Sequence, residues 1–498
     1  MKWIKTQNNK VLDLNDIPLL DLRNLRQEII LESKEGKRVI GFFGAKEASL
    51  IRLYVILADD KNSCLLISSA IISKINSYPS ITNEIPAFHA FEREFFEEFG
   101  VESSDHPWLK PVRYSQNRFD KTQKIENYPF FKMEGEDVHE VAVGPIHAGV
   151  IEPGHFRFMC NGENVYHLEI QLGYQHKNIE DLFLQKNKPL MHLAESIAGD
   201  TVIGHSIAYC NAVEALMNIQ ISERAELIRA VALEMERIAV HIGDLGAISN
   251  DIAYLMGNSI FGATRTLVIN TLLEICGSRY GRGLVREGGV AFDIDENLSD
   301  RISKMLDTIL KSVKIIGETL FSSSSVLSRL EKTGVLSKET ALEIGLAGMS
   351  ARASGISIDI RTNHPWGEYK NRNTEIITMK TGDVYARAYI RYMEIMQSAE
   401  IIRDLLKKLS VCKDNQLLSA FQHKLKSNSI VVSMTEGWRG EVVHTVLTDE
   451  SGNISKYKIK DPSFNNWYGL ALAVRDNGIS NFPLINKSFN LSYCGNDL

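Results

Sequence analysis

Residues 222–246, SERAELIRAVALEMERIAVHIGDLG, decide the fold class of the larger part of the chain. Their apolar side chains recur every three or four residues and therefore share one stripe of a helix. Ser222 stands directly before this stripe, where its hydroxyl can cap the helix. The stretches 301–320 and 383–409 repeat the pattern, and Asp383 opens the second of them. We therefore predict a mostly helical domain in this part of the chain.

Short strands are expected on both sides of the helical region. Three precede it, at 140–143, 156–160 and 166–172. The pair Asn161-Gly162 between the last two is typical of a two-residue hairpin turn. Residues 429–461 return to short strands, because apolar and polar side chains alternate in them. The helical domain therefore has strands at its edges.

The first part of the chain combines strands and helices. Residues 39–43 and 51–57 predict strands, and 88–99 predicts a helix with a strongly acidic face. Residues 115–140 are rich in charges and have little apolar periodicity, which makes them the best candidate for a linker.

The fold class predicted from these patterns is α+β. A small α/β N-terminal domain is expected at 1–125, followed by a mostly helical domain with β-edges at 126–498.

Composition excludes several classes of protein. The 498 residues include 56 basic and 62 acidic side chains, so the net charge of −6 predicts no nucleic-acid partner. Six cysteines without a C-x-x-C pair exclude a disulfide scaffold and indicate a reducing compartment. The first 16 residues lack the apolar stretch of a secretory signal, and the longest apolar run, 65–75, is too short to span a bilayer. We therefore expect a cytosolic protein that can dock on a membrane complex.

Several polar groups could carry chemistry, but each has a structural interpretation that is favoured. The five histidines between His139 and His176 lack the helical spacing of a zinc motif. The glycines of 281–289 follow a helix and predict a turn, not a phosphate loop. Two sets of polar residues lie on helices, and solvated or interface faces are favoured for both. They are Glu234, Arg237 and His241, and Arg387, Arg391 and Glu394.

The order of several short motifs is more informative than any one of them. The motifs are Gly144-Pro145-Ile146-His147, Glu152-Pro153-Gly154-His155-Phe156-Arg157-Phe158, Gly173-Tyr174-Gln175-His176-Lys177, His205-Ser206-Ile207-Ala208-Tyr209, Glu223-Arg224-Ala225, Arg352-Ala353-Ser354-Gly355, Asp359-Ile360-Arg361, Gly382-Asp383-Val384-Tyr385-Ala386-Arg387 and Arg439-Gly440-Glu441. This succession resembles the large subunit of the membrane-bound, energy-converting nickel–iron hydrogenases, including the formate hydrogenlyase type. It also resembles their homologue, the 49 kDa quinone-site subunit of respiratory complex I. The resemblance covers about residues 138–498.

The N-terminal part resembles the 30 kDa subunit of complex I. The motifs are Ala90-Phe91-Glu92-Arg93-Glu94, Glu97-Glu98-Phe99-Gly100 and His106-Pro107-Trp108-Leu109. A fusion of the two subunits in one chain is typical of the formate hydrogenlyase branch.

The metal ligands of the hydrogenase family are missing. Two C-x-x-C pairs hold nickel and iron in that family, because this soft centre needs thiolate donors. The aligned positions here are Ala198, Thr201, Ser492 and Gly495, and Cys494 is one residue out of place. The resemblance therefore implies a chain without a nickel–iron centre and with no metal site of its own.

The quinone site of the complex I family is also incomplete. The resemblance places Pro153 near the family's quinone-binding histidine and Gly199 at its tyrosine. His155 could replace the histidine after a shift of the loop. Nothing obvious replaces the tyrosine, although Tyr209 lies a few turns further on. Quinone binding therefore stays open.

The residues that handle protons in the family are retained. The resemblance places Glu152 at the glutamate that passes protons, and a carboxyl in a shielded cleft suits this task because burial raises its pKa. His205 and Arg439 are expected to shape the same cavity. The alternative is that all three only satisfy buried loops.

The resemblance therefore implies a subunit of a redox complex that couples electron transfer to proton or ion movement. The expected partners are an iron–sulfur small subunit and antiporter-like membrane subunits, at the cytoplasmic side of the inner membrane. The second hypothesis is a non-catalytic coupling subunit of such a complex. A working hydrogenase with unusual ligands is the third and the least favoured, so enzymatic activity stays uncertain.

Overall fold

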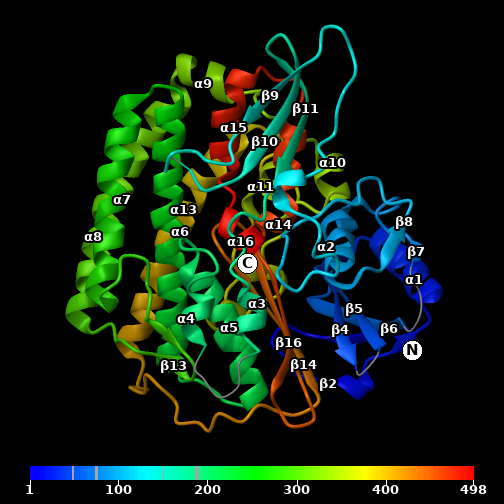
Figure 1. Ribbon diagram of the computed structural model, residues 1–498. Coiled ribbons are helices and arrows are strands. Elements are labelled where there is room, and N and C mark those ends of the chain that lie inside the picture. Colours follow the sequence, from blue (N-terminus) through cyan, green and yellow to red (C-terminus); the bar gives the residue numbers. More distant parts are fainter. Residues whose placement is uncertain (48–49, 73–76, 150, 185–189) are drawn as a thin grey trace.

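The fold is described from a computed structural model that covers residues 1–498 apart from 48–49, 73–76, 150 and 185–189 (Figure 1). The N-terminal part is built on one sheet with the strand order β1-β6-β5-β4, in which β3 pairs with β6. The strands are β1 (Ile4–Thr6), β3 (Leu19–Leu20), β4 (Arg38–Glu47), β5 (Leu50–Asp59) and β6 (Cys64–Ile72). Helices α1 (Leu22–Lys34) and α2 (His89–Phe99) cover one face, and the short strands β7 (Ser77–Pro79) and β8 (Glu102–Ser104) pair beside them.

A second sheet lies against the other face of the first. It has the order β16-β15-β14-β2, with β2 (Leu12–Asp13), β14 (Ser429–Glu436), β15 (Glu441–Thr448) and β16 (Ile454–Lys460). Alternate side chains of β14 point to opposite faces. Val432 and Met434 therefore pack on Phe43 and Tyr54 of the first sheet, whereas Val431 belongs to the core that includes α5 (Val202–Met217). Both faces are covered, which explains why β14 and β15 are buried along their whole length.

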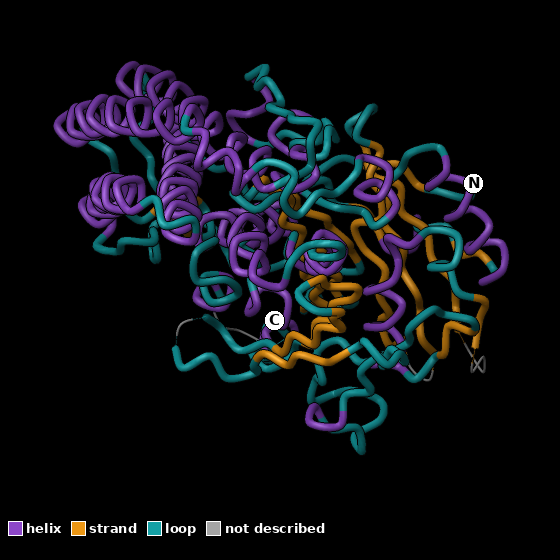
Figure 2. Tube along the Cα trace, turned by 90° about the horizontal axis from the view of Figure 1, so that it is seen from above, coloured by secondary structure: helices purple, strands orange, loops and turns teal. Residues whose placement is uncertain are grey.

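The long helices form a bundle on the far side of α5. They are α6 (Glu223–Asp251), α7 (Leu255–Cys276), α8 (Glu296–Ser322) and α13 (Val384–Val411). Ser222 and Asp383 cap the starts of α6 and α13 through the backbone N–H groups of Ala225 and Ala386. Figure 2 shows these long helices gathered on one side of the molecule and most strands on the other.

Short elements complete the chain between and after these layers. A three-stranded sheet is formed by β9 (His139–Val143), β10 (His155–Asn161) and β11 (Asn164–Gln171). The hairpin β12 (Val285–Arg286) and β13 (Gly289–Val290) follows α7. The remaining helices are α3 (Ile179–Leu182), α4 (Met191–Ala194), α9 (Ser324–Leu330), α10 (Lys338–Glu343), α11 (Gly348–Ala353), α12 (Ile360–Asn363), α14 (Ser463–Ala473), α15 (Phe482–Phe489) and α16 (Tyr493–Asp497), with 3-10 turns η1 (Leu14–Asp16), η2 (Pro86–Phe88), η3 (Ile125–Asn127), η4 (Gly367–Asn371) and η5 (Ile479–Asn481).

The predicted α+β fold class is confirmed. The strands expected at 39–43, 51–57 and 429–461, the hairpin at Asn161-Gly162 and the turn in 281–289 are all present. The domain boundary near residue 125 stays a prediction, and β2 of the N-terminal part pairs with β14 of the C-terminal sheet.

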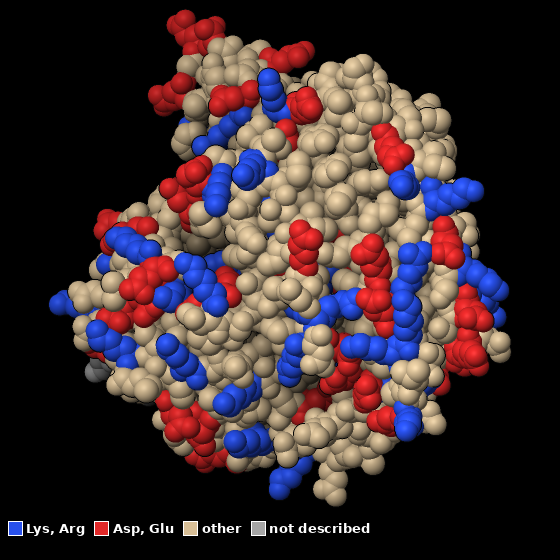
Figure 3. Space-filling model, turned by 180° about the vertical axis from the view of Figure 1, so that it is seen from behind, with Lys and Arg blue, Asp and Glu red and all other residues tan. Residues whose placement is uncertain are grey.

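Two surface properties bear on the expected partners. On the face drawn in Figure 3, basic and acidic side chains are interspersed over the charged areas. Within the described part of the chain, no helix is both long and apolar enough to cross a bilayer.

The contact between the two sheets can be tested at Phe43, which is 2% exposed and stacks on Tyr54 with ring centroids 5.7 Å apart. Phe43→Ala should lower the free energy of unfolding by roughly 3–5 kcal/mol, because it removes a buried ring and leaves a cavity. Phe119→Ala is the matched control, because that ring is 70% exposed. Urea titration followed by circular dichroism measures the free energy of unfolding of both variants. Equal losses in the two would contradict the burial of Phe43 between the sheets.

Candidate functional site

One of the four positions aligned with metal ligands, Thr201, contacts the side chain of Arg439. Ala198 and Thr201 precede α5, while Ser492 and Gly495 belong to the cap and the turn of α16. The Arg439 guanidinium donates to Thr201 Oγ1 at 3.1 Å and, through Nε, to the Asn490 carbonyl oxygen directly before α16. Arg439 therefore joins the start of α5, where the first former pair lies, to the segment directly before α16, where the second lies.

Asp200 neutralises this arginine. Its carboxylate accepts two hydrogen bonds from Arg439, at 2.7 and 2.6 Å, in the bidentate geometry of a strong ion pair. The guanidinium also lies 3.9 Å from the ring centroid of Trp438, whose indole N–H donates to the Asp200 carbonyl oxygen at 2.8 Å. Arg439 is therefore held on one face by an aromatic ring and on its edge by a carboxylate.

The donor atoms present do not fit a nickel–iron centre. Ala198 has no donor, and the Ser492 hydroxyl accepts from the Gly495 backbone N–H at 2.8 Å as the cap of α16. A β-carbon at Gly495 would lie 2.8 Å from the Asp461 carboxylate, so this carboxylate fills the place of a side chain. Cys494 keeps its proton, because burial and the charge of Glu152 raise the pKa of its thiol. No group of three or more His, Cys, Asp or Glu side chains with a metal-binding arrangement occurs in the described residues.

His205 lies in a buried chain of four polar side chains. Its Nε2 is 3.1 Å from Asp461 Oδ2, and its Nδ1 is 3.1 Å from His444 Nε2. The chain ends where the Tyr457 hydroxyl meets His444 Nδ1 at 2.7 Å. One assignment of protons satisfies every contact: Tyr457 donates to His444, His444 to His205, and His205 to Asp461.

The charges of this chain follow from its surroundings. Burial and His205 hold the pKa of His444 well below its ordinary value, so His444 is neutral. Burial alone would raise the pKa of Asp461, but the hydrogen bond from His205 and the charge of Arg439 lower it. The ionised end of the chain is therefore Asp461, beside the former ligand position at Gly495.

Glu152 lies at the other side of α16. Its Oε2 accepts from the Tyr493 backbone N–H at 3.3 Å, and the residue is exposed in this chain. In this chain Glu152 therefore lacks the shielded environment assumed from the sequence. The structure brings Glu152 to Cys494 and Ser492, whereas His205 and Arg439 lie on the Asp461 side of the same short helix.

The residues considered for a quinone have other partners. His155 Nδ1 lies 3.1 Å from the Gly144 carbonyl oxygen, and its ring packs on Phe130 with centroids 4.9 Å apart. Tyr209 donates to Glu287 Oε1 at 2.5 Å and stacks on Phe183. Gly199 supplies no side chain. These contacts do not form the histidine and tyrosine pair that the resemblance implies for a quinone head group.

A solvated or interface face was expected for Glu234, Arg237 and His241, and the solvated alternative is wrong. All three are completely buried where α6 packs on α13. His241 Nε2 lies 2.9 Å from Glu394 Oε2, and Arg237 donates to Glu234 Oε2 at 3.2 Å. These residues face opposite charges from other elements instead of water, which the polar periodicity of one helix cannot reveal.

The second polar set, on α13, is also buried. Glu394 accepts from Arg352 of α11 at 2.8 Å, and Arg391 donates to Asp244 of α6 at 2.8 Å. Arg387 donates to the Ser488 hydroxyl at 2.8 Å and to two carbonyl oxygens. The solvated alternative is therefore wrong for this set too, because its side chains bond to other elements instead of water.

The buried network reaches the site through Arg237. This side chain donates to the carbonyl oxygens of Glu436 at 2.8 Å and Gly437 at 3.1 Å, which directly precede Trp438 and Arg439. Burial alone would raise the pKa of Glu234, but Arg361 and Arg237 hold it at about 2. Burial and Asp359 instead raise the pKa of Glu436 to about 7, although Arg352 opposes this.

Glu236 is a site residue that the sequence did not single out. Its carboxylate accepts from the backbone N–H groups of Ile203 at 2.7 Å and Gly204 at 3.2 Å, at the start of α5. Burial raises its pKa to about 8, although these two hydrogen bonds oppose the shift. The only signal for this role was an acidic residue on the apolar side of α6, next to Met235.

Glu394 provides a test of the buried network. Glu394→Gln should lower the free energy of unfolding by roughly 3–5 kcal/mol at pH 7, because it leaves the Arg352 charge buried without its partner. The control is Glu400→Gln on the exposed side of the same helix, which should change it by less than about 0.5 kcal/mol. Chemical denaturation measures the free energy of unfolding of both variants. An unchanged value in Glu394→Gln would contradict the pairing.

Glu236 provides a test by pH. An acid whose pKa is raised from 4.5 to about 8 on folding binds its proton more tightly in the folded state. The contribution of Glu236 to the free energy of unfolding is fully present below pH 4.5 and is lost as the pH rises towards 8. Glu236→Gln should therefore make the decline of stability between about pH 5 and 8 less steep. Urea midpoints at several pH values measure this, and an unchanged slope would contradict the raised pKa.

Comparison with known proteins is consistent with this geometry. The sequence profile of the respiratory-chain NADH dehydrogenase 49 Kd subunit matches residues 251–497, and that of the 30 Kd subunit matches residues 34–132. Hydrogenase-4 component G of Escherichia coli (strain K12) is 26% identical over 465 residues, which are 89% of this chain and 80% of that protein. A component of the NADH-quinone oxidoreductase of Dehalococcoides mccartyi is 30% identical over 335 residues, which are 66% of this chain and 89% of that protein.

A solved structure shares the fold. One chain of the membrane-bound sulfane sulfur reductase, an archaeal respiratory membrane complex, superposes with a TM-score of 0.67 at 23% identity, over 73% of this chain and 99% of that one. The family profiles and the relatives confirm the resemblance found from the motifs. The chain belongs to the family that unites the 49 kDa subunit of respiratory-chain NADH dehydrogenase with the large subunits of membrane-bound hydrogenases, and it carries a 30 kDa-type segment in the same polypeptide.

Proposed function

We propose that this chain is a subunit of a membrane-associated redox complex that works without a nickel–iron centre and couples electron transfer to proton or ion movement. Its relatives in hydrogenase and NADH-quinone oxidoreductase complexes support the kind of assembly. The observation that carries the proposal is the replacement of all four ligand positions, together with the Arg439–Asp200 pair between them. Hydroxyl and carboxylate groups of Thr201, Ser492 and Asp461 stand at or beside these positions, and such groups hold protons better than they hold a soft metal.

The chain from Tyr457 to Asp461 is the candidate path for protons. Its four side chains have no exposed surface, so a proton that moved along them would be shielded from water. Neutral imidazole accepts a proton on one nitrogen and releases it from the other, which suits His205 and His444 to relay. In this proposal Glu152 exchanges protons with the outer side of α16, and Arg439 stabilises negative charge on Asp461.

The expected partners follow from the same proposal. An iron–sulfur small subunit would cover the exposed Glu152 side and bring electrons close, and antiporter-like membrane subunits would move the ions. The complex would lie at the cytoplasmic side of the inner membrane. A quinone remains a candidate acceptor within the complex, with His155 as the contact from this chain.

A non-catalytic coupling subunit is the second candidate function. The observation that favours it is that Arg439 and His205 already have partners within the chain. In that case the buried groups only stabilise the loops around α16.

Metal analysis of the purified complex tests the absence of nickel. We expect far less than one nickel per chain and no hydrogen uptake or release, because the cavity has no thiolate pair. Stoichiometric nickel would contradict the proposal, and so would hydrogen turnover that is lost in Thr201→Val or Ser492→Ala.

Tyr457→Phe tests the proton path against the coupling-only alternative. The variant keeps the ring stacked on Phe183 but removes the hydroxyl that donates to His444. We expect proton movement per electron in reconstituted complex to fall about tenfold or more, as for loss of a general acid–base group. Tyr280→Phe, at a tyrosine that is 41% exposed, is the control. Unchanged proton movement in Tyr457→Phe, with the complex assembled, would favour the coupling-only role.

A further inference from the structure

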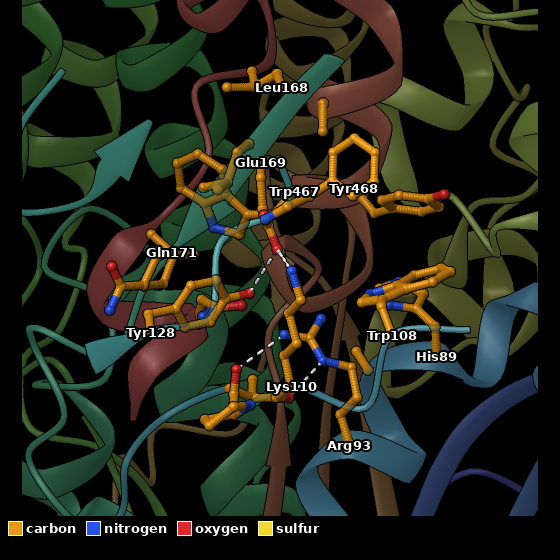
Figure 4. A pocket seen from close by; sticks show the side chains of 18 of the residues that line it. His89, Arg93, Trp108, Lys110, Tyr128, Leu168, Glu169, Gln171, Trp467 and Tyr468 are labelled. Carbon is orange, nitrogen blue, oxygen red and sulfur yellow. Dashed lines mark hydrogen bonds and ion pairs between the residues drawn. The ribbon is translucent and has the colours of Figure 1, made fainter. Parts of the chain in front are cut away.

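A cavity lies between the N-terminal and C-terminal parts of the chain, and Arg439 is not among its lining residues. It has a volume of about 380 Å³, within the usual range of small-molecule sites. Figure 4 shows that its walls come from α2, the segment after β8, β11 and α14. Its aromatic side chains are Trp108, Tyr128, Phe131, Phe464, Trp467 and Tyr468. Such walls can hold a flat ring by stacking.

His89 lines this cavity with both ring nitrogens free. The residue is 4% exposed, and neither nitrogen has a hydrogen-bond partner among the described residues. The ring is fixed by Trp108 and Tyr468, with centroids 5.3 and 4.8 Å away. A buried polar group without a partner costs free energy, so a bound molecule that satisfies it is favoured. Burial and Arg93 hold the pKa of His89 well below its ordinary value, so the ring offers one donor and one acceptor.

The charges at the cavity favour an anion. The lining includes three basic side chains, Arg93, Lys110 and Arg475, against the single carboxylate of Glu169. Lys110 pairs with Glu169 at 2.5 Å, which leaves the two arginines uncompensated within the lining.

Both arginines keep donors unused. Arg93 donates through Nε and Nη2 to the carbonyl oxygens of Lys110 and Pro111, at 2.8 and 2.9 Å. Figure 4 shows its guanidinium turned towards the space beside Lys110 and Trp108. Arg475 Nε is buried without a partner among the described residues. An anionic group on a ligand would supply the missing acceptor.

We propose that this cavity binds a planar heteroaromatic molecule that carries an anionic group, a phosphate or a carboxylate. The aromatic walls hold the ring, His89 pairs with donor and acceptor atoms at its edge, and the arginines bind the anion. The site is separate from the former metal cavity and does not depend on the proposed redox function. Trp467 links the two, because its indole N–H donates to the Ser492 carbonyl oxygen at 3.3 Å.

Isothermal titration calorimetry on the full chain tests this with two matched pairs of probes. The pairs are adenosine monophosphate with adenosine, and quinoline-2-carboxylate with quinoline. We expect the affinity of at least one anionic probe to exceed that of its neutral partner by about tenfold or more, because only the anion pairs with the arginines. Binding of the nucleotide alone would identify a phosphate ligand, and binding of the quinoline acid alone a carboxylate. Binding of no probe, or equal binding within both pairs, would overturn the proposal.

Two variants locate the binding. His89→Phe keeps the ring shape but removes both nitrogens, and Arg475→Gln removes a charge that is only half-buried, so the fold should persist. Each should weaken binding of the anionic probe about tenfold, while His423→Phe and Arg372→Gln, on other surfaces, leave it unchanged. Thermal unfolding checks that the variants are folded. Unchanged binding in both His89→Phe and Arg475→Gln would place the probe elsewhere and overturn the proposal.

Discussion

Buried charges must be paired, and this constraint holds the C-terminal part of the chain together. Where α6 and α13 pack, Asp244 meets Arg391 and Glu394 meets both His241 and Arg352. Removing such charges from water is costly, and only close opposite charges with full hydrogen bonding offset the cost. The pairs join elements that are far apart in sequence, so they fix how the helices lie against each other. Through Arg237, the same network fixes the end of β14 and the turn after it, which carries Arg439.

The fold could largely be predicted because its apolar patterns match its elements. The stripe of 222–246 and the cap at Ser222 give α6, and the alternation around Val443 gives β15. Pairing across the chain was not accessible in this way. Nothing in the residues near Leu12 indicates that they join the C-terminal sheet. The two-residue alternation of a strand shows which side chains share a face, but it does not show which strand lies beside it.

The candidate site was predicted only in part. Alignment to the family located Thr201 and Ser492, and Arg439 lies in one of the motifs that carry the resemblance. Asp200 stood between the two former ligand positions and was the best available signal for the partner of Arg439. Asp461 gave no such signal, because it lies 256 residues from His205 and meets it only through the fold. The polar side of α6 was misread for a similar reason: periodicity separates polar from apolar side chains but does not distinguish water from an opposite charge.

Restoring cysteines at the former ligand positions would not by itself restore the metal site. A cysteine restored at Gly495 would place its β-carbon 2.8 Å from Asp461, and its thiolate would meet a buried carboxylate that His205 and Arg439 keep ionised. Two anions at this distance disfavour each other, so the thiol would hold its proton and bind a metal poorly. Asp461 is also the end of the chain from Tyr457, and it cannot move aside without breaking the contact with His205. The same carboxylate that blocks the old metal site therefore anchors the hydrogen-bonded chain, and the cavity cannot serve both chemistries at once.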